Sequence, residues 1–210
     1  MFSRFRNDEE SMMDTGQTLA FLLFAFIAAV TPGPSNTLVL STGAAVGTLR
    51  GIGCPLGASL GMGAMIVLSA FGVGEIVAAA PAIVIAMKLA GSLFLLWLAW
   101  KIANAGTVEA DGQRRVVGFR QAFLFQWLNP KGWLVALSAG STFLVSSQHA
   151  EARGALWMGA LFAAAAFPAG FVWLVLGALV AQFLRTPRSA RFFNIAMALA
   201  LALSVALVWR

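Results

Sequence analysis

The sequence predicts an all-α, polytopic membrane protein with six transmembrane helices. Of its 210 residues, 60% are apolar and only 10% are charged, whereas soluble domains carry about 25% charged residues. The apolar residues form six long runs, and about 20 residues are needed to cross a bilayer. These runs do not alternate in polarity with the period of a β-strand, which argues against a membrane β-barrel.

The six helices are expected in two groups of three. A polar N-terminal segment, residues 1–17, precedes a single membrane domain, residues 18–210. The helices are expected at 18–41, 53–79, 82–103, 121–146, 154–183 and 192–209. The polar linker 104–120 divides the domain into halves 18–103 and 121–210. Because each half has an odd number of helices, the second half is expected to be inverted relative to the first, as in many transporters.

Helices one and four are predicted to be broken. The first contains Thr31-Pro32-Gly33-Pro34-Ser35-Asn36, and the fourth contains Asn129-Pro130-Lys131. Proline removes a backbone donor and clashes with the preceding turn, and in lipid such backbone is tolerated only where it is buried in protein or lines a cavity. Each break is either a structural kink or one half of a transport site, and breaks paired between two halves favour the site.

The chemistry of a broken helix suits a zwitterion. The free N–H groups at the start of a half-helix favour an anion such as a carboxylate, and the freed carbonyls on the other side can accept an ammonium group. Lys88 and Lys131 either extend to the membrane interface or meet the substrate carboxylate. The candidate substrate-binding residues are Pro32, Gly33, Pro34, Asn36, Lys88, Gln126, Asn129, Pro130, Lys131 and Asn194.

Glycines in the second predicted helix recur every four residues, at Gly53, Gly57 and Gly61. Small residues at this spacing allow two helices to approach closely in lipid. The same face is available for packing within the chain, for sliding during transport, or for a homodimer. Glu75 is the only carboxylate in or beside a predicted helix, and it leaves the residue that would couple transport to protons open.

Several function classes are excluded by the residues. There is no phosphate-binding glycine loop and no paired set of metal ligands, so no enzyme, cofactor or metal is expected. One cysteine and one histidine provide neither an intrachain disulfide nor a zinc site. The net charge of +6 is concentrated in short loops, which fits the charge bias of membrane proteins rather than nucleic-acid binding.

The basic residues also predict the orientation. Of the lysines and arginines in the loops, at the helix ends and in the chain termini, eight fall on one side and four on the other. The eight are Arg50, Lys101, Arg114, Arg115, Arg120, Arg185, Arg188 and Arg191, and the four are Arg4, Arg6, Arg153 and Arg210. Because cytoplasmic loops carry the excess of positive charge, the three basic loops are expected in the cytoplasm and both termini outside.

The chain resembles the LysE/RhtB family of amino-acid exporters. The resemblance rests on residues 31–36, the glycine-rich stretch 51–61, residues 88–101 and residues 119–133. It implies a secondary transporter in the bacterial inner membrane that exports an amino acid or a derivative, driven by the proton gradient. Many members carry an aspartate after a glycine where this chain has Gly61-Met62, and this difference leaves the substrate open. A passive channel and a non-transporting subunit of a membrane assembly are the alternatives.

Overall fold

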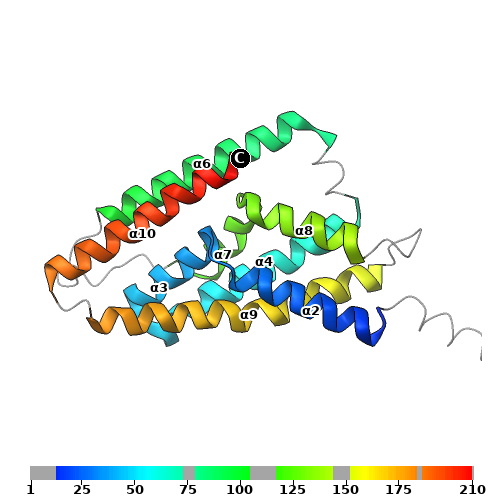
Figure 1. Ribbon diagram of the computed structural model, residues 1–210, viewed down its shortest axis with the longest axis horizontal. Helices are drawn as coiled ribbons and strands as arrows, with labels where there is room; N and C mark the ends of the chain where they lie inside the picture. Colours follow the sequence, from blue (N-terminus) through cyan, green and yellow to red (C-terminus); the bar gives the residue numbers. More distant parts are fainter. Residues whose placement is uncertain (1–12, 73–78, 105–116, 144–151, 184–185, 210) are drawn as a thin grey trace, which may run out of the picture.

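A computed structural model describes residues 13–72, 79–104, 117–143, 152–183 and 186–209. These described residues form eight α-helices and contain no β-strand (Figure 1). The predicted all-α class is therefore confirmed over the part of the chain that the structure describes.

The first predicted helix consists of two helices, α2 (Thr15–Val30) and α3 (Pro34–Gly51), bent by 62° at the intervening residues. A capping box begins α2, in which the Asp14 carboxylate accepts a hydrogen bond from the Gln17 N–H at 2.7 Å. The cap adds a turn before the predicted start at residue 18. Near its other end α3 is kinked at Gly47, whose φ of 78° lies in a region that glycine enters without a steric penalty.

The fourth predicted helix is also divided. It forms α7 (Phe119–Trp127) and α8 (Pro130–Phe143), separated by Leu128 and Asn129. Pro130 is the first residue of α8, a position where the missing N–H of proline has no helical partner to lose. Both predicted breaks are therefore confirmed, and a proline begins the second helix of each pair.

The remaining helices are α4 (Gly53–Ala70), α6 (Pro81–Ala103), α9 (Ala152–Phe183) and α10 (Pro187–Val208). Among the described helices, α4 and α9 are long and apolar enough to cross a membrane, and the bent α2–α3 pair would provide a third crossing. The helix α9 continues through Pro168, so no break occurs there. Glu75 lies outside the described residues.

The helices pack as a bundle with an outer pair (Figure 1). Within the bundle, α9 packs against α3, α4 and α2, while α4 also packs against α7 and α8. The helices α6 and α10 pack side by side and run obliquely along one side of the bundle. Each long bundle helix, α4 or α9, therefore contacts both parts of one broken helix.

Glycines set the distance between these helices. The predicted glycine face of α4 lies against α7, where a Cβ atom on Gly61 would lie 2.8 Å from the Phe123 carbonyl oxygen and one on Gly57 would overlap the Phe119 carbonyl. The expectation of close helix packing is confirmed. Because α7 of the same chain fills this face, the face is not available to a second copy.

Two apolar clusters flank the breaks. One joins α2, α4, α8 and α9, and it includes the buried side chains Phe21, Met65, Trp133, Met158 and Phe162. The other joins α3, α4, α6, α7, α9 and α10, and it includes Leu38, Cys54, Leu95, Phe125 and Leu174. Each broken helix passes from one cluster to the other at its break, so the breaks lie between the two clusters.

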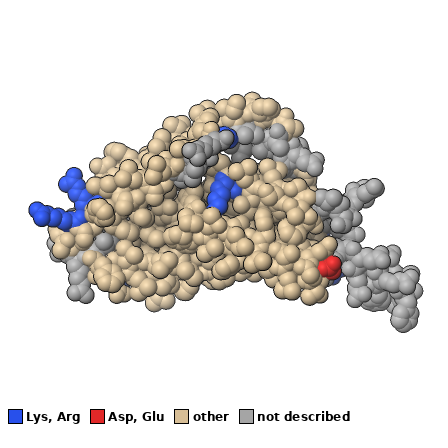
Figure 2. Space-filling view, viewed as in Figure 1, with Lys and Arg blue, Asp and Glu red and all other residues tan. Residues whose placement is uncertain are grey.

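The outer surface is strongly apolar. Large apolar side chains stand exposed on all the major helices, among them Leu23, Leu93, Leu134, Leu176 and Leu199. Soluble proteins rarely expose such extensive apolar surface, whereas lipid requires it. Figure 2 shows basic groups at the end of the molecule where α10 begins, whereas the middle of the same face is mostly uncharged. The surface is that of a membrane protein.

Candidate functional site

The first break is built around prolines that remove two helical donors. In a continuous helix, residues 32 and 34 would donate to the carbonyls of Ala28 and Val30, but Pro32 and Pro34 have no N–H. The Val30 carbonyl instead accepts a hydrogen bond at 3.2 Å from the Trp173 indole of α9. A side chain from another helix therefore replaces a backbone donor that the sequence has removed.

Asn36 donates two further hydrogen bonds at this break. Its Nδ2 donates to the carbonyl oxygens of Ala29 and Thr31, each at 2.8 Å, and the side chain is buried. The amide spans the gap between the end of α2 and the first turn of α3. The prolines create the break, and Asn36 makes its polar backbone tolerable in an apolar environment.

At the second break, Asn129 accepts hydrogen bonds from the N–H groups at the start of α8. Asn129 accepts a hydrogen bond on Oδ1 from the Lys131 N–H at 3.2 Å, and its carbonyl accepts from the N–H groups of Gly132 and Trp133 at 2.9 and 3.3 Å. These bonds occupy the first N–H groups of α8. In contrast, the N-cap residue before α3 is Gly33, and no side chain accepts a cap hydrogen bond from the first N–H groups of α3. Of the two half-helices, α3 presents the more open N-terminus for an anion.

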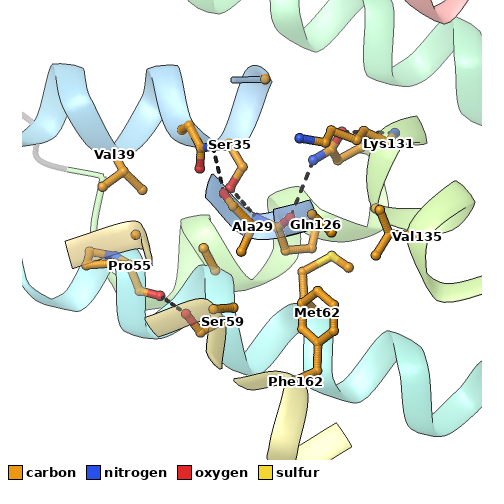
Figure 3. Close-up of a pocket in the computed structure, with 18 residues that line it drawn as sticks. Ala29, Ser35, Val39, Pro55, Ser59, Met62, Gln126, Lys131, Val135 and Phe162 are labelled. Atoms are coloured by element: carbon orange, nitrogen blue, oxygen red, sulfur yellow. Dashed lines mark hydrogen bonds between the residues drawn. The ribbon is translucent and has the colours of Figure 1, made fainter. Parts of the chain in front are cut away.

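Two side-chain hydrogen bonds connect the breaks. The Lys131 ammonium donates to the Thr31 carbonyl at 2.7 Å, and the Gln126 Nε2 donates to the Ser35 hydroxyl at 3.0 Å. Figure 3 shows Lys131, Gln126 and Ser35 converging beside one cavity. A Cβ atom on Gly33 would lie 3.1 Å from Lys131 Cδ and 3.3 Å from its Nζ. The glycine therefore provides the space that the lysine side chain uses.

The cavity lies between the broken helices and their partners α4 and α9. Its empty space amounts to about 550 Å³, a figure that includes the part open to solvent. Small apolar side chains dominate the lining, and Lys131 is the only ionisable side chain among the described residues that line it. The lining residues are Ala28, Ala29, Gly33, Ser35, Asn36, Val39, Pro55, Ala58, Ser59, Met62, Gln126, Asn129, Lys131, Gly132, Val135, Phe162, Ala166 and Gly170.

The structure brings together part of the predicted set. Five of the predicted residues line the cavity, and Pro32, Pro34 and Pro130 form the breaks beside it. The five are Gly33, Asn36, Gln126, Asn129 and Lys131. Lys88 and Asn194 lie on α6 and α10, outside the cavity lining. The Lys88 ammonium lies 5.8 Å from the centre of the Trp209 ring, whose indole donates to Ser92 at 2.9 Å.

Several residues at the site were not among the predicted ones. Ser35 belongs to the first break motif and its hydroxyl contacts Gln126, so the motif itself contained the signal. Met62 lines the cavity one residue after Gly61. Phe162 and Trp173 come from the middle of α9, where nothing in the sequence distinguishes them from other apolar residues.

A cavity between two broken helices, set in an apolar helical protein, is typical of a membrane transporter. The sequence matches the LysE type translocator family over residues 26–208, and the chain belongs to that family. The predicted resemblance is thus confirmed. No solved structure matches the chain.

Two bacterial relatives share about a third of their aligned residues with this chain. The cysteine/O-acetylserine efflux protein of Salmonella typhimurium (strain LT2) is 35% identical over 131 residues, which cover 62% of this chain and 67% of the relative. The protein of the same name from Escherichia coli (strain K12) is 34% identical with the same coverage. The family and these relatives support amino-acid export.

Proposed function

We propose that the protein is a secondary transporter that exports a small neutral amino acid, or a derivative of one, across the bacterial inner membrane. The observation that carries this proposal is a cation, Lys131, held between two helix breaks in a cavity whose other described lining residues are neutral. The relatives named for cysteine and O-acetylserine efflux support a small neutral substrate. The proton gradient is the proposed driving force.

The proposed architecture has six membrane-spanning segments in two inverted halves. Segments one and four are the pairs α2–α3 and α7–α8. The packing supports this arrangement because α9 contacts both parts of the first pair, α4 contacts both parts of the second, and α6 pairs with α10. With the basic loops in the cytoplasm and both termini outside, α3 and α7 form the cytoplasmic parts of the broken helices.

The proposed binding mode follows from the charges at the site. Lys131 and the open N-terminus of α3 attract the substrate carboxylate, and the carbonyls at the end of α2 attract its ammonium group. The side chain then lies against small apolar residues such as Ala58 and Ala166, beside Met62. Because none of the described lining residues carries a carboxylate, a cationic side chain would have no counter-ion among them, and its transfer from water would be costly.

Efflux from cells tests this proposal. Cells expressing matched amounts of protein are loaded with dipeptides that release either cysteine or lysine, and each amino acid is followed in the medium. We expect export of cysteine with little export of lysine, and loss of export when an uncoupler collapses the proton gradient. Flux that survives the uncoupler and runs in both directions would indicate a passive channel instead. An absence of any flux would favour a non-transporting assembly subunit.

Two lysine variants locate the site in the same assay. Lys131→Met is expected to reduce export by about tenfold or more, as for the loss of a charge partner worth at least 1.4 kcal/mol. Lys88→Met is expected to retain export, because Lys88 lies in the outer helix pair against Trp209. The opposite pattern, with loss in Lys88→Met alone, would move the site away from the cavity.

A further inference from the structure

The Lys131 ammonium binds a carbonyl that belongs to the other break. The Thr31 carbonyl oxygen accepts hydrogen bonds from Lys131 Nζ at 2.7 Å and from Asn36 Nδ2 at 2.8 Å, so both of its lone pairs are occupied. Asn36 is buried and is also held by its hydrogen bond to the Ala29 carbonyl. The Lys131 ammonium, in contrast, is carried by a flexible four-carbon side chain. Lys131 is therefore the more easily displaced of the two donors.

We propose that the Thr31 carbonyl is the subsite for the ammonium group of the substrate, and that Lys131 occupies this subsite in the empty transporter. This inference rests on the proposed function. A zwitterion that enters the cavity replaces one primary ammonium with another at Thr31. The released Lys131 then pairs with the substrate carboxylate, and the Thr31 carbonyl keeps two donors throughout.

The surroundings of Lys131 support this exchange. Lys131 is partly buried among apolar residues, where a cation is usually paired with an acidic group. Among the described residues that line the cavity there is no carboxylate, and the ammonium donates to the Thr31 backbone carbonyl. Gly33 provides the space for the lysine chain. Its φ of −178° is extended backbone that other residues adopt, so the glycine is needed for space rather than for backbone conformation.

Binding of substrate fragments to the purified protein in lipid nanodiscs tests the exchange. The probes are propylamine, which carries only the ammonium group, and propionate, which carries only the carboxylate. Calorimetry gives the dissociation constant of each. If Lys131 fills the subsite most of the time, its removal raises the apparent affinity of a competing amine by the inverse of the fraction of time that the subsite is free. We expect Lys131→Met to bind propylamine about tenfold more tightly than the wild type and to lose propionate binding.

A second variant keeps the lysine but disturbs its position. Gly33→Ala places a Cβ atom 3.1 Å from Lys131 Cδ, which is too close for an unchanged side chain. We expect this variant to bind propylamine more tightly than the wild type while still binding propionate. If Lys131→Met does not fold, Gly33→Ala decides the question. As a control, Arg153→Gln removes an exposed cation at the start of α9 and should leave both affinities unchanged.

An unchanged or weaker affinity for propylamine in the folded variants would overturn the assignment of Thr31 and Lys131. That result would leave the exporter proposal standing if the wild type still exports amino acids. Conversely, tighter propylamine binding in both variants would support the subsite even if the efflux assay showed no export. The two proposals therefore fail separately.

Discussion

The bend between α2 and α3 depends on the donor groups of one buried amide, and Asn36→Ala should show this in the free energy of unfolding. The variant removes the donor to the Ala29 carbonyl and one of two donors to the Thr31 carbonyl. Hydrogen bonds within membrane proteins contribute on average about 0.6 kcal/mol each, and a buried carbonyl left without a donor costs about 1–3 kcal/mol. We expect a loss of about 2–4 kcal/mol, measured by unfolding in mixed detergent micelles titrated with sodium dodecyl sulfate.

Asn36→Asp distinguishes hydrogen bonding from packing. The aspartate has nearly the same volume as asparagine, but it places an oxygen where the Nδ2 donor contacts two carbonyl oxygens. We expect Asn36→Asp to be at least as destabilising as Asn36→Ala. Ser138→Ala is the matched control, because this exposed hydroxyl bonds only the Leu134 carbonyl of its own helix and should change stability by less than about 0.5 kcal/mol. An aspartate variant as stable as the wild type would refute the reasoning.

Other positions test further parts of the fold in the same unfolding assay. Trp173→Phe keeps a large ring but removes the indole donor to Val30, and it should cost about 1–2 kcal/mol; no change would mean that this carbonyl needs no donor from α9. Gly61→Ala brings a Cβ atom to 2.8 Å from the Phe123 carbonyl and should force α4 and α7 apart, with a loss of about 1–3 kcal/mol as for an overpacked core. Gly47→Ala meets no atom within 4 Å but should still cost about 1–3 kcal/mol, because φ of 78° with ψ of 179° is a conformation that only glycine readily adopts.

The sequence was sufficient to predict features that depend on local chemistry. Pro32, Pro34 and Pro130 remove backbone donors wherever they stand, so both breaks could be placed without knowledge of the fold. The spacing of Gly53, Gly57 and Gly61 likewise places three small residues on one face of any helix that contains them. The sequence could not reveal that α7 covers this face, because that contact joins residues from different halves of the chain.

The positions of Lys88 and Lys131 show what could not be predicted from the sequence. Both lie in apolar segments, and both could meet a substrate carboxylate. Lys131 directly follows a break and therefore lies at the cavity, whereas the position of Lys88 depends on which face of α6 packs toward the bundle. That face is set by tertiary contacts, including the Trp209 ring near the C-terminus. The same limit applies to Trp173, whose partner Val30 is distant in sequence.

The two breaks are similar in sequence but differ in how their polar groups are satisfied. At the second break, Asn129 accepts hydrogen bonds from the first N–H groups of α8, so these groups are satisfied by a residue of the same break. At the first break, Asn36 binds the carbonyls of the helix that precedes, and the start of α3 has no side-chain cap. The first break therefore offers both an open helix N-terminus and a carbonyl shared with a displaceable cation. The second break supplies that cation, so the proposed site requires both halves of the chain.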